Sequence, residues 1–423
     1  MIRTSLAALL LTLAATANAQ SLDVRAGRLI DPGSARVLTD QRIRITDGKI
    51  VSVTTWRDAD GPAGVDWSGE TVLPGLIDLH THIADGAISS SDPAEPLKHS
   101  ESATILKAVK AAKVMLDAGF TSVRDVGVYR GLTDVALRDA IAAGDVEGPR
   151  MWVAGGYITT PGGGGEIDAL APDIALPATF RIGVVHNVAD ARDRARYLLD
   201  HGADFIKLIA TGAVLAIGSE PGALELSPEE MKAACDEAKL RGSYCIAHAH
   251  GAEGIKQAIA AGARTIEHAS YLDAEGIALA NRYGVWLDMD IYDGDWIDEV
   301  GTREHWPAEY LRKNRETTDV QRRGFAAAVK AKVKLTFGTD AAVYPYGLGA
   351  RQFAYMVRYG MTPMQAIQAA TSEAARALRM DGKVGSLAPG AYGDLVAVKG
   401  DPLADIRVLE HIDGVIKEGK RVK

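Results

Sequence analysis

Two histidines, His80 and His82, close the apolar run LPGLIDLHTHI and are separated by a single residue. Alternate side chains of a β-strand point to the same face, so both imidazoles are expected on one side of the strand. Neutral imidazole is a common zinc ligand, and a shared metal ion would relieve the crowding of the two rings. Alone, the pair is as compatible with a metal site as with two ordinary histidines at a strand end.

Other apolar runs also end in side chains that can bind metals. These are Lys207 in ADFIKL, His248 and His250 in SYCIAHAH, His268 in ARTIEH, and Asp340 in VKLTFGTD. Five such strand ends are hard to attribute to chance, so we interpret them as parts of one site. An ammonium group cannot bind a cation, so Lys207 would need the neutral amine that burial favours. A surface lysine is the alternative for this residue.

The middle of the chain alternates helix patterns with short strands. A helix start is clear at Ser227-Pro228-Glu229-Glu230, which combines a capping residue, an early proline and acidic residues near the helix dipole. Repeated helix–strand units predict a parallel sheet, and their number predicts a (β/α)₈ TIM-like barrel over residues 74–380. A doubly wound open sheet is the alternative, but no glycine phosphate fingerprint follows the first strand. In a barrel, the C-terminal strand ends carry the active site.

Both ends of the mature chain read as short strands and turns. Residues 20–73 alternate apolar and polar side chains, with Asp47-Gly48 as a hairpin turn, and residues 381–423 have the same texture. We therefore expect a small β-sandwich domain built from both termini.

Residues 1–19 have the pattern of a secretory signal peptide. Arg3 precedes an apolar run that ends in Ala17-Asn18-Ala19, an A-x-A cleavage site. The run is too short to span a membrane as a mature helix, and no second apolar span follows, so no membrane partner is expected. The mature protein is predicted to be secreted or periplasmic. The net charge of −8 without a basic cluster gives no basis for nucleic-acid binding.

The two cysteines, Cys235 and Cys245, could pair in an oxidising compartment. Cys235 lies in a helix pattern and Cys245 in the strand that follows, and a bridge needs Cα atoms within about 7 Å. We expect two buried free thiols without a catalytic role.

The chain resembles the amidohydrolase superfamily over nearly its whole mature length. The matching motifs are GLIDLHTH, FIKLIATG, IAHAHG, IEHAS and FGTDAAV, with the closing stretch TPMQAIQAATSEAARALRMDGKVGSLAPGAYGDLVAVKGDPL. The resemblance implies two Zn²⁺ ions bridged by a carboxylated Lys207, and a catalytic Asp340 that moves the proton. It places the metal ligands at His80, His82, Lys207, His248, His268 and Asp340. It also implies a homo-oligomer, with an octamer as one form.

The stretch SYCIAHAHG is similar to the Xaa-Pro dipeptidase and carboxypeptidase-like, imidazolonepropionase-related branch, which includes ochratoxin-degrading amidohydrolases. In that branch the tyrosine and the second histidine bind the substrate α-carboxylate, which here implies Tyr244 and His250. Core packing is the alternative for Tyr244, and support of a zinc ligand the alternative for His250. The implied reaction is hydrolysis of the amide bond to a C-terminal amino acid in a small molecule or short peptide with a free carboxylate. Ochratoxin A, which would give ochratoxin alpha and phenylalanine, is one such substrate.

Two loops are expected at the barrel mouth. The Gly- and Pro-rich residues 155–183 should form one loop. Residues 289–310 should form a second, which either brings Tyr292, Trp296 and Trp306 near the mouth or leaves them packed against other side chains.

A deaminase lacks support because Gly251 stands where a deaminase of this superfamily has a glutamate. A dihydroorotase-like or lactonase activity on the same metals, and a scaffold without chemistry, remain as alternatives.

Overall fold

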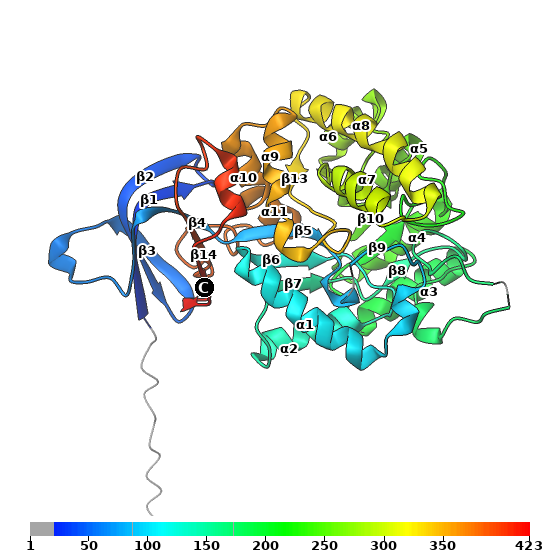
Figure 1. The fold of residues 1–423 in the computed structure, drawn as a ribbon, viewed down its shortest axis with the longest axis horizontal. Coiled ribbons are helices and arrows are strands. Elements are labelled where there is room, and N and C mark those ends of the chain that lie inside the picture. Colours follow the sequence, from blue (N-terminus) through cyan, green and yellow to red (C-terminus); the bar gives the residue numbers. More distant parts are fainter. Residues whose placement is uncertain (1–20, 87, 172) are drawn as a thin grey trace, which may run out of the picture.

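A computed structural model describes residues 21–86, 88–171 and 173–423. Two parts lie next to each other, a β-rich domain and a larger part in which helices surround strands (Figure 1). The predicted signal peptide, residues 1–19, lies outside the described residues. Within the described residues, no helix is long and apolar enough to cross a membrane.

The larger part is a closed parallel barrel. Its strands are β5 (Leu76–Thr81), β6 (Phe120–Asp125), β7 (Arg150–Val153), β8 (Tyr157–Ile158), β9 (Ile206–Ile209), β10 (Cys245–Ala249), β11 (Thr265–His268), β12 (Trp286–Asp288) and β13 (Leu335–Thr336). β7 pairs with β6, and β8 pairs with β9. These two short strands together take the place of one strand, so the barrel has eight strand positions. The Leu79 amide of β5 donates to the carbonyl of Phe337, which directly follows β13, at 2.9 Å, and this bond joins the first barrel strand to the last. This closure confirms the predicted barrel and excludes the open sheet.

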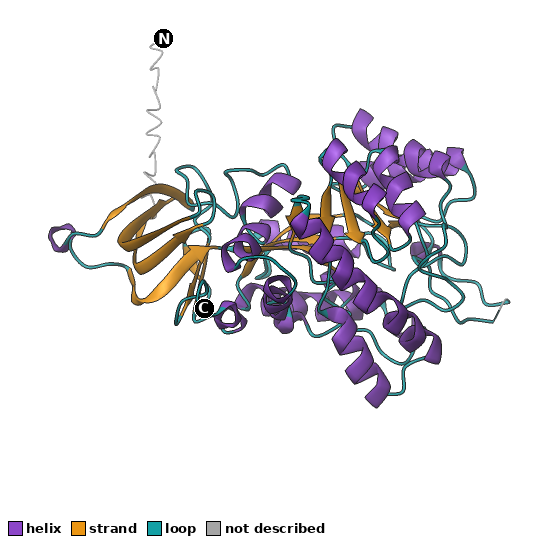
Figure 2. Cartoon of the chain, turned by 90° about the horizontal axis from the view of Figure 1, so that it is seen from above, coloured by secondary structure: helices purple, strands orange, loops and turns teal. Residues whose placement is uncertain are grey.

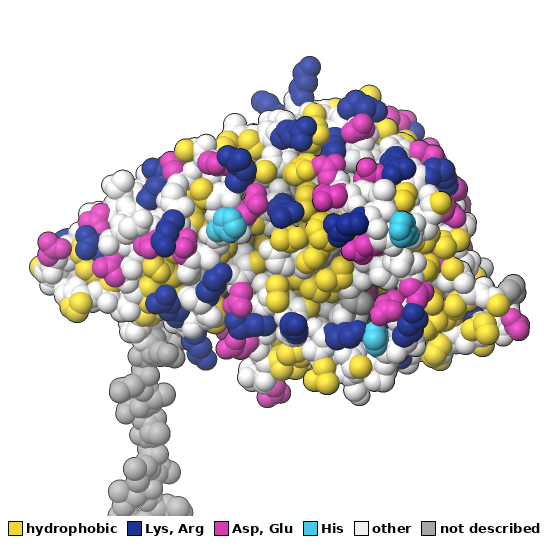
Figure 3. All heavy atoms as spheres, in the orientation of Figure 1, with side chains coloured by type: hydrophobic (Ala, Val, Ile, Leu, Met, Phe, Trp, Pro, Cys, Tyr) yellow, Lys and Arg dark blue, Asp and Glu magenta, His cyan; other side chains and the backbone are white. Residues whose placement is uncertain are grey.

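Helices cover the outside of the barrel (Figure 2). They are α1 (Glu101–Asp117), α2 (Thr133–Ala143), α3 (Val188–Asp200), α4 (Pro228–Leu240), α5 (Ala252–Ala261), α6 (Ala274–Tyr283), α7 (Asp293–Arg303), α8 (Ala308–Lys330), α9 (Arg351–Arg358), α10 (Pro363–Ala369) and α11 (Ser372–Ala377). The predicted start of α4 is confirmed, because Ser227 and Glu230 form a reciprocal capping box. Lys, Arg, Asp and Glu side chains are interspersed over the face shown in Figure 3.

The β-rich domain takes strands from both chain ends, as predicted. One seven-stranded sheet runs in the order β16-β15-β14-β4-β1-β2-β3, with β1 (Ser21–Asp31), β2 (Arg36–Thr46), β3 (Lys49–Thr55), β4 (Val65–Pro74), β14 (Leu395–Val398), β15 (Gly414–Lys417) and β16 (Lys420–Arg421). The sheet curls on itself, since the Ile50 amide donates to the Ala391 carbonyl at 2.9 Å. It is therefore a single curled sheet around its own apolar core rather than two stacked sheets. Asp47 and Gly48 form the predicted hairpin turn between β2 and β3, both with positive φ.

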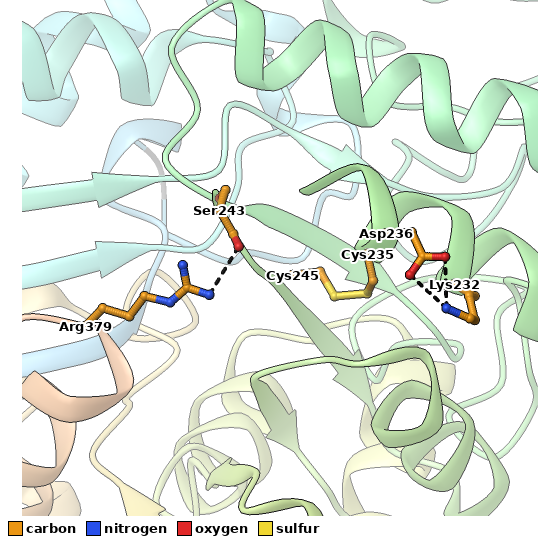
Figure 4. Close-up of a disulfide and its surroundings, with 6 residues drawn as sticks. All are labelled: Lys232, Cys235, Asp236, Ser243, Cys245 and Arg379. Atoms are coloured by element: carbon orange, nitrogen blue, oxygen red, sulfur yellow. Dashed lines mark hydrogen bonds and ion pairs between the residues drawn. A yellow bond between two sulfur atoms is a disulfide. The ribbon is translucent and has the colours of Figure 1, made fainter. Parts of the chain in front are cut away.

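The expectation of two free thiols was wrong. Cys235 of α4 and Cys245 of β10 form a disulfide, and their Cα atoms are 5.2 Å apart (Figure 4). The helix packs directly over the strand that follows it, so the two residues come within bridging distance although each belongs to a different element. The bridge fixes α4 against the strand that ends in His248 and His250.

Candidate active site

One pocket lies at the C-terminal ends of the barrel strands. Its lining includes all six predicted metal ligands and His250, namely His80, His82, Lys207, His248, His250, His268 and Asp340. They come from β5, β9, β10 and β11 and from the segment after β13. Parallel strands end at a common rim, so residues up to 260 positions apart in sequence meet here.

Asp340 joins the first two histidines. Its Oδ1 lies 3.4 Å from His80 Nε2 and 3.2 Å from His82 Nε2. His80, His268 and Asp340 together present one ligand atom each within 4.8 Å of one another. A single divalent ion could be held by such a group.

Three imidazoles form a second group. His248, His250 and His268 each present a ring nitrogen within 4.8 Å of the others. The His250 Nδ1 lies 2.7 Å from the Ser270 hydroxyl, and His248 Nε2 lies 3.2 Å from the Gly212 carbonyl. The sequence predicted His248 and His268 as the second pair of ligands, and the structure places His250 beside them.

Hydrogen bonds orient two of the ligand rings. The His82 Nδ1–H donates to the Gly127 carbonyl at 2.9 Å, and the Tyr157 hydroxyl lies at the same distance from this nitrogen. The His268 Nδ1–H donates to the Asp290 carboxylate at 2.7 Å. In both rings this leaves Nε2 for a metal ion and fixes the ring plane, as outer hydrogen bonds do in metal sites.

A fully buried ion pair lies behind His80. The Arg124 guanidinium donates to both carboxylate oxygens of Glu267, at 2.9 and 3.1 Å, and both side chains have no exposed surface. Glu267 Oε2 lies 3.3 Å from His80 Nδ1, and Asp288 lies 3.7 Å from the guanidinium. Burial and the Glu267 charge raise the pKa of Asp288 well above its usual range. This cluster forms the floor of the site.

Lys207 is buried in the pocket, with 1% of its surface exposed. Within the described residues its ammonium nitrogen has neither a hydrogen bond nor an ion pair within 4 Å. Burial lowers the pKa of Lys207 to about 8, against the raising effect of Glu267 and Asp340. A much larger fraction of neutral amine is therefore present near pH 8 than for an ordinary lysine.

The donor set fits metal ions better than an ordinary polar cluster. Burial holds the pKa values of His80, His248 and His250 well below the usual range, so these imidazoles are neutral. His80 Nδ1 is buried and makes no hydrogen bond with the described residues. Neutral imidazoles beside a carboxylate are donors that divalent cations require of a protein.

Two of these residues have strained backbones. His268 has φ of 66° and Asp340 has φ of 54°, a left-handed region that costs a non-glycine residue of order 1–3 kcal/mol. The strain turns each side chain from its strand end toward the pocket.

Tyr244 is not in the pocket, which corrects the expectation that it binds substrate. It precedes β10, at the opposite end of the strand from His248. Its ring stacks on Phe205 with centroids 5.6 Å apart, and Arg264 and Arg379 lie over it at 5.7 and 5.0 Å. Its hydroxyl is buried without a hydrogen-bond partner.

The second predicted loop is largely helical, since residues 293–303 form α7. Tyr292, Trp296 and Trp306 pack in an apolar cluster and are not among the lining residues, which favours the packing alternative. Two neighbours that the sequence did not suggest, Ile297 and Tyr310, do line it.

The sequence profile of the amidohydrolase family matches residues 71–422. The chain belongs to the amidohydrolase family. Ochratoxinase from Aspergillus niger is 29% identical over 98% of this chain and 89% of its own sequence. Its crystal structure, with 28% identity, has a TM-score of 0.85 and covers 96% of each chain.

Two solved structures carry amino-acid-like molecules. A Xaa-Pro dipeptidase with methionine bound in its active site is 36% identical, with a TM-score of 0.89 over 96% of this chain and 100% of its own. A prolidase complexed with N-methylphosphonate-L-proline is 28% identical, with a TM-score of 0.87 over 96% and 100%. The predicted resemblance is thus confirmed, and this amidohydrolase is a hydrolase whose relatives support amide-bond cleavage.

Proposed function

We propose that this amidohydrolase is a binuclear zinc enzyme that hydrolyses the amide bond to a C-terminal amino acid. The observation that carries the proposal is the meeting of five histidines, Asp340 and Lys207 in one pocket at the barrel rim. Carboxypeptidase, dipeptidase and N-acyl-amino-acid amidase activities share this reaction, and ochratoxin A is included among the substrates.

Two zinc ions would be held by the ligands that the sequence predicted. His80, His82 and Asp340 would hold one, His248 and His268 the other, and a carboxylated Lys207 would lie between them. When bound, the metals make water a nucleophile near neutral pH and polarise the scissile carbonyl. Carboxylation needs the neutral amine, which the lowered pKa of Lys207 supplies.

Asp340 is the residue proposed to move the proton. Its carboxylate lies beside His80 and His82, and those imidazoles hold its pKa well below the usual range against the effect of burial. It can take the proton of the attacking water and pass it to the leaving nitrogen. Asp290 would keep His268 in a fixed orientation through this step.

Relatives with amino-acid ligands support the substrate class. The dipeptidase holds methionine and the prolidase an N-substituted proline, and both molecules have a free α-carboxylate. In this chain His250 lines the pocket and is proposed to contact that carboxylate. Export to an oxidising compartment is also proposed, since the Cys235–Cys245 disulfide fits such a location.

Metal analysis and a substrate panel test the proposal together. Protein purified without chelator should contain about two zinc ions per chain. N-acyl amino acids, dipeptides and ochratoxin A should be cleaved, whereas dihydroorotate and lactones should not. Turnover of only the cyclic substrates would replace the proposal with the dihydroorotase-like or lactonase alternative.

Lys207 variants test the carboxylated lysine. Lys207→Ala should lose metal and activity, and Lys207→Arg should restore neither, because a guanidinium stays protonated and forms no carbamate. Propionate with zinc should partly rescue Lys207→Ala. A fully active Lys207→Arg enzyme would show that no carbamate is needed.

A further inference from the structure

With Tyr244 outside the pocket, the substrate carboxylate needs another hydrogen-bond donor. Among the described residues that line the pocket, Lys207 is the only lysine or arginine, and it belongs to the metal centre. The carboxylate must therefore be met by neutral donors. A phenol is such a donor, and a hydrogen bond to a carboxylate is stronger than one between neutral groups.

Tyr129 lies in the loop after β6 and lines the pocket. Its backbone amide donates to Asp85 Oδ1 at 2.9 Å, which fixes the loop at this residue. Its ring meets the Tyr157 ring edge-on, with centroids 5.5 Å apart, and the Tyr157 hydroxyl lies 2.9 Å from His82. Tyr129 is therefore held one ring away from a proposed metal ligand.

The Tyr129 hydroxyl makes no hydrogen bond with any described residue. Several other hydroxyls of the pocket are occupied: Thr317 and Thr318 donate to carbonyls of α8, at 2.8 and 2.7 Å, and Ser270 contacts His250. Burial raises the pKa of Tyr129, so its phenol keeps its proton at neutral pH. A half-buried phenol that lines a pocket without a partner is available to a ligand.

Tyr310 is the other pocket-lining phenol that makes no hydrogen bond within the described part of the chain, but it lies farther out. The pocket face of α8 carries Tyr310, Asn314, Thr317, Thr318 and Gln321. Gln321 donates to Asp290, next to the metal ligands. Eleven residues of helix put Tyr310 about 16 Å along the axis from Gln321. A carboxylate two bonds from the scissile nitrogen has to lie nearer the metals than that.

We propose that Tyr129 donates its phenolic hydrogen to the α-carboxylate of the leaving amino acid, as a second donor beside the proposed contact of His250. The Tyr129 hydrogen bond would orient the carboxylate, and metal ions, when bound, would supply the positive charge. The assignment rests on the proposed function, because a substrate without this carboxylate would not need the contact. It makes Tyr129 a substrate-binding residue on a loop rather than on a barrel strand.

Paired tyrosine variants test the proposal. Tyr129→Phe and Tyr244→Phe each delete one hydroxyl that lacks a partner, one inside the pocket and one outside it. Zinc-loaded wild type and both variants are compared on an N-acyl amino acid and on its C-terminal amide. Tyr129→Phe should lower kcat/KM on the acid about tenfold to a hundredfold and change the value on the amide less than threefold.

Tyr244→Phe should leave kcat/KM on both the acid and the amide unchanged, and the zinc content of all three proteins should be equal. Equal loss on acid and amide in Tyr129→Phe, or acid-specific loss in Tyr244→Phe, would overturn the assignment of Tyr129. Loss of zinc in Tyr129→Phe would overturn it too, since the residue would then act through Tyr157 and His82. A wild type that cleaves no acyl-amino acid would instead refute the proposed function.

Discussion

The buried ion pair behind His80 allows a prediction that separates stability from metal binding. Glu267→Gln keeps the side-chain volume and removes the charge that faces Arg124. Breaking a buried pair costs about 3–5 kcal/mol, because the remaining charge is left uncompensated. Asp288 lies 3.7 Å from the guanidinium and can ionise in response, which favours the lower end of that range.

A loss of about 3 kcal/mol is a more than hundredfold change in the folding equilibrium. Urea unfolding of the metal-free protein measures it. Zinc affinity should also fall about tenfold to a hundredfold, since Glu267 lies 3.3 Å from the ring of His80. Competition with a chromogenic chelator measures this second effect separately.

A second substitution provides the control. Arg124→Met in the Glu267→Gln background removes the orphaned charge and should recover at least half of the lost stability, but not the zinc affinity. Glu253→Gln, at an exposed position of α5, should leave both quantities unchanged. If Glu267→Gln is as stable as wild type, or if the double variant is less stable than the single one, the ion pair does not make the proposed contribution to folding stability.

Three further predictions concern other parts of the chain. Because the pKa of Lys207 is lowered to about 8, the rate at which zinc reactivates metal-free protein at a constant concentration of dissolved CO₂ should rise about fivefold from pH 7 to pH 8 and level off above pH 9; a rate that keeps rising tenfold per pH unit would show an ordinary lysine. Replacing Cys235 and Cys245 by alanine should cost about 2.7 kcal/mol in chain entropy for a separation of 10 residues, measured by urea unfolding, and equal stability would contradict this. Gly338→Ala should lose zinc and solubility, because the added Cβ would lie 1.9 Å from the Asp288 carboxylate. Gly69→Ala should lose neither, because no atom lies within 4 Å of the Cβ that it adds.

Strand periodicity explains what the sequence could and could not predict. Ligand-type residues at the ends of apolar runs predicted the site, because parallel strands end together. The same periodicity argues against Tyr244: four residues before His248 in an extended strand is about 13 Å toward the other end of the barrel. Arg124 and Glu267 are 143 positions apart, so nothing local pairs them. The available signal was a charged side chain inside each of two otherwise apolar strands, Arg124 in SVRDV and Glu267 in TIEH.

The arrangement divides the site between two kinds of structure. Metal ligands and the ion pair beneath them lie on strands or directly at strand ends, where paired backbones allow little movement. Tyr129 comes from a loop, Ile297 from α7 and Tyr310 from α8, and these are the groups that a substrate would meet beyond the metals. Changes in the buried ion pair should therefore alter zinc affinity, and with it the activity on every substrate alike. Changes in the loop and helix residues should alter the ratio of kcat/KM between substrates. The two sets meet at Tyr157, whose ring packs against Tyr129 and whose hydroxyl lies 2.9 Å from His82, so a change at Tyr129 can reach the metal centre through this contact.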